Sequence, residues 1–263
     1  MVDKKSQVVQ RWDGERFSFT NDVFADEHII DLLLNGEQMT SLLASRQDLE
    51  ALCLGHFRTE FSVDVQECEY EIHVSESNGC YSVDLTINID EKPMPRKQIV
   101  TSSCGACDKF GLPEAVAKDI VVDNPLQPIH IDELLECLGK MQEQQILFQN
   151  TGGVHAAALF YSNGDFMIRE DIGRHNAVDK VIGMHILQQR ESHPVGLLLS
   201  GRCGWDIVAK AAQFNIPCIA AIGAVSQLAA DVARRSNISV LAFAREGKAT
   251  AIGPVEGRFQ AKH

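Results

Sequence analysis

From about residue 130 onward, stretches with the period of a helix alternate with short apolar stretches of strand length. The helical stretches are Ile131 to Phe148, Arg174 to Gln189, Trp205 to Phe214 and Ser226 to Arg235. The strand-like stretches are Phe166 to Ile168, Val195 to Leu199, Cys218 to Ile222 and Ile238 to Phe243. Strands connected through helices tend to run parallel in one sheet. The alternation therefore predicts an α/β fold with a partly parallel sheet. Within it, Thr151-Gly152-Gly153 predicts a turn, and the small residues Ala156 to Ala158 favour a helix.

The first hundred residues instead alternate apolar and polar residues with the period of a strand. Asp13-Gly14 and Asn35-Gly36 lie between such segments and are strong hairpin signals. Further antiparallel strands are predicted around a Ser77-Asn78-Gly79 turn, at Val63, Val65, Ile72 and Val74 and from Tyr81 to Ile89. One helix is predicted within Gln47 to Arg58. These patterns divide the chain into an N-terminal β-rich subdomain with one helix at 1–100, a loop and linker at 101–128, and an α/β domain at 129–263.

The charge of the chain limits its partners. The formal net charge of -12 disfavours binding to nucleic acids and anionic membranes, but it leaves room for a local basic pocket. No apolar run follows the N-terminal lysines, and no run of about 18 apolar residues could span a bilayer. We therefore expect a cytoplasmic protein whose eight cysteines stay reduced. The cysteines expected to be buried are Cys53, Cys68, Cys137 and Cys218.

Two other cysteines are close together, in the segment Thr101-Ser102-Ser103-Cys104-Gly105-Ala106-Cys107. Thiols three residues apart can meet across one turn and share a proton, a disulfide or a metal ion. Prolines on both sides of the segment predict a loop. The spacing alone leaves three interpretations open: a reactive pair, half of a metal site, or an incidental pair of thiols.

Four polar turns follow strands in the second half of the chain, where α/β sheets usually bind their ligands. They are Glu170 to Asn176, Ser200-Gly201-Arg202, Gly223 to Ser226 and Phe243 to Lys248. Helix N-termini and arginines in such turns attract phosphate, while an aromatic ring and a carboxylate could recognise a base. Simpler interpretations stay open: an N-cap for Ser226, an ion pair between Asp171 and Arg174, a solvated Arg202, and an ordinary charged turn at Phe243 to Lys248.

Several of these segments together resemble the FdhD family, whose members are sulfurtransferases that help molybdenum-dependent formate dehydrogenases to mature. The matching segments are Thr101 to Cys107, Thr151 to Ala157, Glu170 to Lys180, Ser200 to Arg202, Lys210 to Ala212, Ile216-Pro217 and Phe243 to Arg245. The run from Asp171 to Lys180 is the most distinctive, and the resemblance covers most of the chain from roughly residue 25 onward.

The resemblance implies a cytidine-deaminase-like, three-layer α/β/α domain and a persulfide carrier. Cys104 would carry sulfur, with Cys107 as its companion, from a cysteine desulfurase to the bis-molybdopterin guanine dinucleotide cofactor. The residues expected to bind this cofactor, or its fragments GDP and GMP, are Gly173, Arg174, His175, Gly201, Arg202, Phe243, Ala244, Arg245, Glu246, Gly247 and Lys248. No tightly bound metal is expected. The implied partners are the desulfurase and the formate dehydrogenase apoenzyme, without nucleic acid or membrane, and a homodimer is compatible with the sequence.

The chain departs from the family pattern in places, and other classes of protein compete with this interpretation. Asp108 stands where the family often has glycine, and Cys203-Gly204 follows Arg202 in place of a residue and then serine. A zinc nucleoside deaminase would also need His-x-Glu or Cys-x-Glu, which occurs nowhere in the chain. A thioredoxin-like enzyme would place its CxxC early, between a strand and a helix. A noncatalytic chaperone for the cofactor or the apoenzyme stays open as the alternative.

Overall fold

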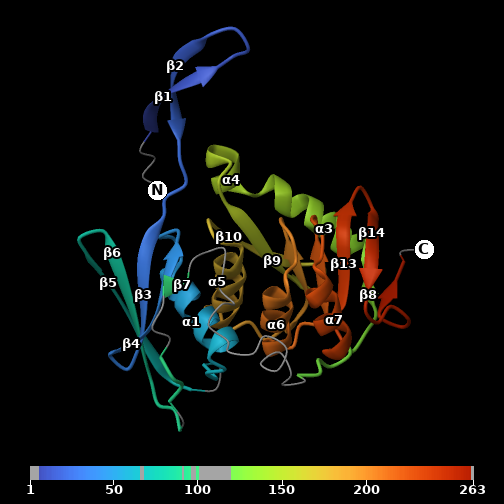
Figure 1. Ribbon diagram of the computed structural model, residues 1–263. Helices are drawn as coiled ribbons and strands as arrows, with labels where there is room; N and C mark the ends of the chain where they lie inside the picture. The colour runs from blue at the N-terminus through green and yellow to red at the C-terminus, as the bar shows by residue number, and fades with distance from the viewer. Residues whose placement is uncertain (1–5, 66–67, 91, 96–98, 101–119, 262–263) are drawn as a thin grey trace.

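In the computed structural model, which describes residues 6–65, 68–90, 92–95, 99–100 and 120–261, two sheets lie on either side of a layer of helices (Figure 1). The larger sheet belongs to the second half of the chain and the smaller one to the first half. A two-stranded arm projects away from this body.

The larger sheet has six strands in the order β10-β9-β11-β12-β13-β14. They are β9 (His155–Tyr161), β10 (Phe166–Asp171), β11 (Pro194–Leu199), β12 (Cys218–Ala221), β13 (Ser239–Arg245) and β14 (Lys248–Ile252). β11, β12 and β13 run parallel, and the other neighbours pair antiparallel. The α/β class and the partly parallel sheet predicted from the sequence are therefore confirmed.

Helices cover both faces of this sheet. On one face lie α5 (Arg174–Leu187), α6 (Trp205–Gln213) and α7 (Gln227–Arg235), and on the other lies α3 (Ile131–Glu143). The side chains of β11 alternate between the two cores: Leu197 and Leu199 pack with α5 to α7, whereas Leu198 packs with α3. Next to α3, the short strands β8 (Ile129–His130) and β15 (Phe259–Gln260) pair in parallel. This is the three-layer α/β/α arrangement that the resemblance implied.

The first half of the chain forms a five-stranded sheet in the order β5-β6-β3-β4-β7. Its strands are β3 (His28–Leu34), β4 (Glu37–Ala44), β5 (Tyr70–Ser77), β6 (Cys80–Ile87) and β7 (Ile99–Val100). The two hairpins turn at Asn35-Gly36 and Asn78-Gly79, as predicted, and all four residues have positive φ. β3 pairs with β6 in parallel, so the sheet is mixed, whereas the alternation had predicted antiparallel strands throughout.

Val63 and Val65 were predicted to lie in a strand, and this prediction is wrong. Both lie in the irregular segment after α1 (Leu49–Glu60), and both side chains are buried in the core. Alternation of apolar and polar residues indicates that every second side chain is buried. An irregular segment that packs against a core can bury its side chains in the same way.

α1 packs against α5 at very short range because a glycine of each helix faces the backbone of the other. A Cβ atom on Gly183 would lie 1.8 Å from the carbonyl oxygen of Ala51, and one on Gly55 would lie 1.8 Å from that of Asp179. No side chain fits at either position unless the helices separate. Since α1 also packs under the five-stranded sheet, this contact joins the two halves of the molecule.

The predicted helix from Ile131 to Phe148 is two helices, α3 and the short α4 (Ile146–Thr151). The first helix ends at Glu143, with Gln144 as its C-cap. The main-chain N–H groups of Leu147 and Phe148 then donate to the carboxylate of Glu170, at 2.8 and 2.9 Å. A partner far away in the sequence therefore sets the start of α4, which local periodicity cannot reveal.

Ala156 to Ala158, predicted to favour a helix, lie in β9 between β10 and β11. All three side chains are buried, and they alternate between the two cores of the sheet. Small residues in a central strand let helices approach from both sides, and this environment outweighs the helix propensity of alanine.

Of the four cysteines expected to be buried, Cys53, Cys137 and Cys218 are. Cys68 is only half-buried, and this prediction is wrong. It precedes β5 and lines a surface cavity, so its side chain packs against the core but stays partly open to solvent.

The arm consists of β1 (Ser6–Trp12) and β2 (Phe17–Val23), paired antiparallel around the predicted Asp13-Gly14 turn. Asp13 closes the turn by accepting from the main-chain N–H groups of Glu15 and Arg16, both at 2.9 Å. Figure 1 shows the arm standing clear of both sheets, with its root beside α4.

Candidate anion-binding site

The polar turns predicted from the sequence meet at one edge of the six-stranded sheet. β9 begins with His155, opposite Asp171 at the end of β10, and Leu199 at the end of β11 pairs with Ala157 of β9. β12 and β13 run parallel to β11, so they end at the same edge. The four turns follow β10, β11, β12 and β13, which end at the same edge although β9 lies between β10 and β11, and such an edge is the expected ligand site of an α/β sheet.

A cavity of about 350 Å³ opens between the turns after β11 and β12 and the start of α5. Its lining consists of Arg174, Arg202, Cys203, Gly204, Ala224, Val225 and Ser226. The two turns are held together, because the N–H of Cys203 donates to the carbonyl of Ala224 at 3.0 Å. The structure thus brings Arg174 and Arg202, two residues predicted to bind a phosphate, to the same cavity.

Helix N-termini add to the positive potential of this edge. α5 begins after Gly173 and α6 after Gly204, and neither glycine can supply a side-chain cap. In α6 the carboxylate of Asp206 accepts from the N–H of Ile207 at 3.0 Å. α7 is capped by Ser226, whose Oγ accepts from the N–H of Ala229 at 3.2 Å. The N-cap interpretation of Ser226 is confirmed. The helix dipole favours a negatively charged ligand at the N-termini of α5 and α6.

The basic side chains at this edge are close enough to influence one another. His155 is half-buried, and a Cβ on Gly201 would lie 3.3 Å from its Nδ1. Burial lowers the pKa of His155, and the charges of Arg174, His175 and Arg202 lower it further. A histidine repelled by three basic neighbours marks a region of positive potential, which an anion would relieve.

Asp206 is the counter-charge of this region. Its carboxylate contacts Nε2 of His175 and lies 3.9 Å from the Arg174 guanidinium. Burial raises the pKa of Asp206, but the hydrogen bond and charge of His175 outweigh it, so the pKa lies below its usual value. Asp206 and His155 were not among the predicted site residues. For Asp206, the signal was an acidic residue in the first turn of a helix that follows a predicted phosphate turn.

Cys203 places a thiol in the wall of the cavity. The side chain is buried, and burial raises its pKa to about 12. At neutral pH the group is therefore a thiol and not a thiolate, so it is a poor nucleophile and a poor metal ligand. Cys203 forms part of the packing of this turn.

The segment from Phe243 to Lys248 ends β13 and turns into β14. The side chain of Phe243 is exposed, its φ is 52°, and its N–H donates to Gly223 beside the cavity. Ala244 is buried, and Glu246 and Gly247 form a two-residue turn with positive φ. An exposed aromatic residue with left-handed backbone conformation in a bulged strand is unusual and often marks a binding site. Arg245, Glu246, Gly247 and Lys248 are exposed and do not line the cavity.

The sequence profile of the FdhD/NarQ family matches residues 25–253. The chain belongs to the FdhD/NarQ family. It is similar to the sulfur carrier protein FdhD of Picrophilus torridus, with 32% identity over 253 residues that cover 94% of each chain. The sulfur carrier protein FdhD of Streptomyces coelicolor is 32% identical over 260 residues, which cover 93% of this chain and 91% of the relative.

A solved structure supports the fold of this FdhD/NarQ chain. It is a crystal structure of a protein from Desulfotalea psychrophila, described as a candidate formate dehydrogenase accessory protein. The TM-score is 0.76 over 98% of this chain and 99% of the other, at 21% sequence identity. The resemblance proposed from the sequence motifs is therefore confirmed at the level of the family and the fold.

The most distinctive FdhD/NarQ motif, Asp171 to Lys180, supports the site through buried polar contacts. The Asp171 carboxylate is fully buried and lies 2.6 Å from Nζ of Lys180. It also accepts from the N–H groups of Ser45 and Gly173 and from the amide of Asn176. An ion pair between Asp171 and Arg174, the simpler interpretation of this turn, is therefore wrong. Because Asp171 is neutralised internally, Arg174 is left to face the cavity.

A second buried ion cluster lies deeper in the same helix layer. The ammonium of Lys210 contacts Asp179 and Glu60, both at 2.8 Å. Asp179 also accepts from Thr59 at 2.8 Å and contacts Nδ1 of His56 at 2.9 Å. These five side chains come from α1, α5 and α6, so their charges join three helices in the FdhD/NarQ fold.

Cys104 and Cys107 lie outside the described residues. The described chain stops before them at β7, which pairs with β4, and resumes at Ile120. Val122 then donates its N–H to Ser236 and accepts from Asn237.

Among the residues that the structure describes, no three His, Cys, Asp or Glu side chains are placed to hold a metal ion. In that same part of the chain, no helix is long and apolar enough to cross a membrane.

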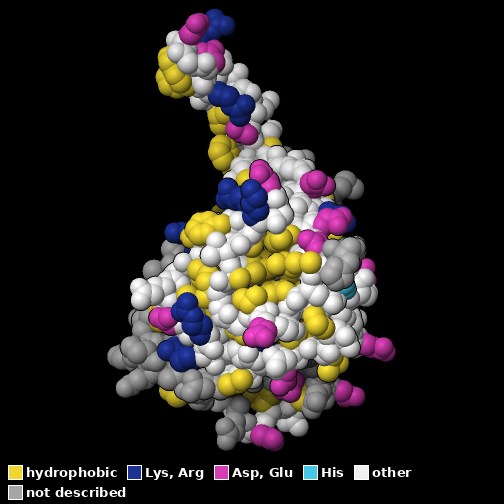
Figure 2. Space-filling model, turned by 90° about the vertical axis from the view of Figure 1, so that its right-hand side faces the viewer, with side chains coloured by type: hydrophobic (Ala, Val, Ile, Leu, Met, Phe, Trp, Pro, Cys, Tyr) yellow, Lys and Arg dark blue, Asp and Glu magenta, His cyan; other side chains and the backbone are white. Residues whose placement is uncertain are grey.

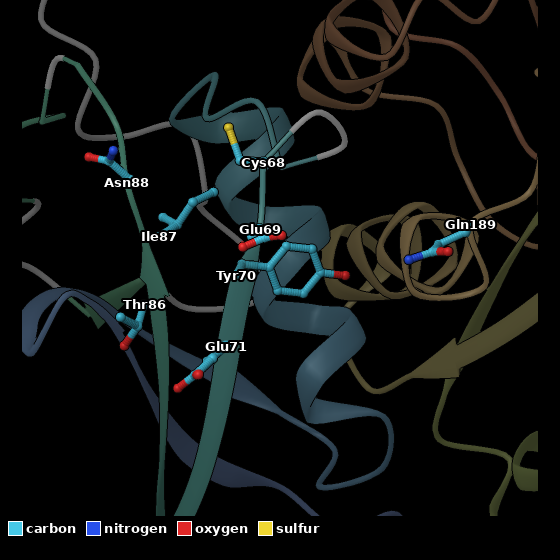
Figure 3. A pocket seen from close by; sticks show the side chains of 8 residues that line it. All are labelled: Cys68, Glu69, Tyr70, Glu71, Thr86, Ile87, Asn88 and Gln189. Carbon is cyan, nitrogen blue, oxygen red and sulfur yellow. The ribbon is translucent and has the colours of Figure 1, made fainter.

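Two larger cavities lie at the opposite end of α5. One, of about 720 Å³, is formed by the ends of β5 and β6 and by Gln189, which follows α5 (Figure 3). Figure 3 shows the hydroxyl of Tyr70 pointing toward Gln189, and burial raises the pKa of Tyr70. The other, of about 750 Å³, lies at the starts of β11 and β12. Since α5 is about 21 Å long, neither cavity is part of the arginine site.

Proposed function

We propose that this chain is a sulfur carrier that accepts sulfur from a cysteine desulfurase as a persulfide on Cys104. It delivers the sulfur to the bis-molybdopterin guanine dinucleotide of a formate dehydrogenase. The names of its relatives support the sulfur carrier, and that of the structural neighbour supports the client enzyme. The observation that carries the proposal is the convergence of Arg174 and Arg202 on one cavity of a protein with a net charge of -12. Such a cavity suits the diphosphate of a guanine nucleotide.

The sulfur transfer proceeds by exchange between sulfur atoms. The Cys104 thiolate attacks the outer sulfur of the donor persulfide, whose S–S bond breaks, and the donor cysteine leaves as a thiolate. The Cys107 thiolate then attacks the inner sulfur of the Cys104 persulfide. A Cys104–Cys107 disulfide forms, and the outer sulfur takes up a proton and leaves as hydrosulfide toward the cofactor. A dithiol reductant restores the two thiols and is itself oxidised to a disulfide.

Intact-mass analysis tests the first of these steps. Incubation of the reduced protein with a cysteine desulfurase and cysteine is expected to add one sulfur atom, about 32 Da, to Cys104. Peptide mapping locates the added mass. Cys80→Ala removes an exposed thiol from β6 and serves as the control, which should gain the same mass. A protein that gains no sulfur, or gains it only on other cysteines, would contradict the proposal.

Loss of the Arg202 guanidinium should weaken the binding of GDP. We expect Arg202→Ala to reduce the binding free energy by about 1.5–3 kcal/mol, the usual contribution of a hydrogen bond to a charged group. The effect should be much smaller for guanosine, which has no phosphate for the arginine to hold. Calorimetry with GDP, guanosine and ADP measures both quantities.

Arg235→Ala is the matched control for this measurement. It removes the same charge from the exposed last turn of α7, so GDP binding should change little. Equal binding of ADP and GDP would show that Phe243 to Lys248 does not recognise the base. If no nucleotide binds at millimolar concentration, the phosphate site lies elsewhere.

A further inference from the structure

One titratable side chain beside the arginine cavity makes no hydrogen bond. His155 begins β9, its side chain is half-buried, and its ring has no hydrogen-bond partner within the described part of the chain. The other histidine of this edge, His175, contacts the carboxylate of Asp206 through Nε2. The protein therefore fixes the surroundings of His175 but leaves the protonation of His155 free to respond to a ligand.

Close contacts place the ring of His155 against the turn that follows β11. Ser200 closes this turn onto β9, since its Oγ accepts from the N–H of Ala156 at 2.8 Å and its own N–H donates to the carbonyl of Ala156 at 3.0 Å. The next residue is Gly201, where a Cβ would lie 3.3 Å from Nδ1 and 3.5 Å from Cε1 of His155. The Nδ1 edge of the imidazole thus faces the backbone of the turn, with no side chain between them.

The same turn borders the cavity. Arg202 and Cys203 follow Gly201 directly, and both line the cavity. On this side, the carbonyl of Gly201 accepts from the N–H of Gly223 at 3.0 Å. The backbone of one turn therefore separates His155 from the place proposed for the phosphate. Charges that act over such a short and partly buried path are weakly screened.

Three basic side chains act on His155. Arg174 and His175 lie at the start of α5, and Arg202 lies on the turn after β11. Burial lowers the pKa of the His155 imidazole, and the charges of these three side chains lower it further. In the free protein the ring is therefore mostly neutral at pH 7.

The acidic side chains nearby do not offset this repulsion. Asp171 lies opposite His155 on β10 and raises its pKa, but the Asp171 carboxylate is 2.6 Å from Nζ of Lys180. Glu170, also on β10, accepts from two main-chain N–H groups of α4. Asp206, on α6, contacts basic side chains of α5. Each of these carboxylates already has a partner, so positive charge remains for an anion to neutralise.

This positive potential is local to the edge of the sheet. The chain has a formal net charge of -12. On the face shown in Figure 2, acidic side chains are scattered widely over the body, whereas basic ones gather in a few places. A diphosphate carries several negative charges. Its entry would reverse the local balance of charge, and a nearby negative charge favours the protonated form of a histidine.

We propose that His155 takes up a proton from solvent when a phosphate anion binds between Arg174 and Arg202. The imidazolium then forms part of the counter-charge of the anion, on the other side of the Gly201 turn. Binding is thereby coupled to pH: the affinity for the anion rises as the pH falls, and loss of the proton favours release. This inference rests on the proposed nucleotide site, but it does not depend on the sulfur transfer.

Calorimetry of GDP binding between pH 8 and pH 6 tests the coupling. Relative to His155→Asn, the natural protein should gain affinity as the pH falls, by up to about tenfold per pH unit, the limit for uptake of one proton. At the upper end of this range the two proteins should bind GDP alike. The terminal phosphate of GDP also titrates here, but it does so with both proteins, so the ratio of their affinities reports the histidine.

His73→Asn is the matched control. It makes the same substitution at an exposed position of β5, so the pH dependence of GDP binding should equal that of the natural protein. Thermal unfolding shows whether each variant is folded.

Nuclear magnetic resonance of the natural protein provides a measurement that needs no variant. The imidazole signals of His155, recognised by their proximity to Gly201, should titrate at a higher pH when GDP is saturating than when it is absent. The signals of His73 should titrate at the same pH in both samples.

Two groups of results would overturn the inference, and they differ in what they leave standing. If GDP binds but its pH dependence is the same in the natural protein and the His155 variant, no proton is taken up there. Signals of His155 that titrate at an unchanged or lower pH in the complex would lead to the same conclusion. Both results would leave the nucleotide site in place. Failure of GDP to bind at all would exclude the nucleotide site, and the proton uptake with it.

Discussion

Replacing Cys104 with alanine should abolish the activation of formate dehydrogenase. Cells in which this variant replaces the natural protein should show only the activity of cells without the protein, because no persulfide can form without the thiolate that attacks the donor. The two hydrophobic cores of the described residues are built from other side chains. We therefore expect unchanged thermal unfolding and unchanged GDP affinity. Formate dehydrogenase activity in cell extracts is the measurement.

Cys80→Ala is the matched control, since it also removes one thiol and Cys80 is exposed at the start of β6. It should support full activity. Full activity of the Cys104 variant would exclude the proposed sulfurtransferase activity. It would favour a noncatalytic chaperone that holds the cofactor or the apoenzyme with the same arginine cavity.

Lys210→Met should destabilise the protein by about 3–5 kcal/mol, the usual cost of removing one partner from a buried ion pair. Lys210 and Asp179 are 2% and 1% exposed, so the substitution leaves a carboxylate in the interior without its main counter-charge. A loss of this size is a large part of the stability of a typical domain. Urea unfolding followed by circular dichroism measures it.

Lys140→Met provides the control. Lys140 pairs with Glu136 on the exposed side of α3, and the loss of such a pair costs only a few tenths of a kcal/mol. If the two variants were equally stable, the buried cluster would make no net contribution to folding.

The effect of Lys210→Met should depend on pH. Burial raises the pKa of Asp179, but Lys210 and His56 outweigh it, so the pKa lies below the usual 3.8. For Lys210, burial lowers the pKa, but Asp179 and Glu60 outweigh it, so the pKa lies above the usual 10.5. The pair therefore stabilises the fold between these two values. Its contribution is lost as the pH falls through the native pKa of Asp179, or rises through that of Lys210. In acid, the natural protein and the Lys210→Met variant should therefore have similar free energies of unfolding.

The sheet and its ligand edge could be predicted because their signals are local. A strand, a turn with glycine and a helix follow one another at Gly173, Gly201 and Gly223, and parallel strands bring such turns to one edge. The N-cap at Ser226 and the hairpin turns are local in the same sense. Each needs only a few neighbouring residues to be recognised.

Features that depend on distant partners could not be predicted. Ala156 to Ala158 form a strand because of the helices on both sides of it, which the segment itself does not encode. The position of Asp206 in its helix was a local signal, but its contacts with Arg174 and His175 depend on α5 and α6 lying side by side. The reactive role of Cys104 and Cys107 rests on the resemblance to the family and stays a prediction, since both lie outside the described residues.

The contact of Gly55 with Gly183 has a consequence for how the protein loses its structure. At these two glycines the backbones of the helices are in direct contact, and α1 is buried on nearly every side. Opening the contact would expose α5 and the sheet behind it together with the core of the five-stranded sheet. We therefore expect the protein to melt as one cooperative unit, and fragments divided at the linker to fold only in each other's presence.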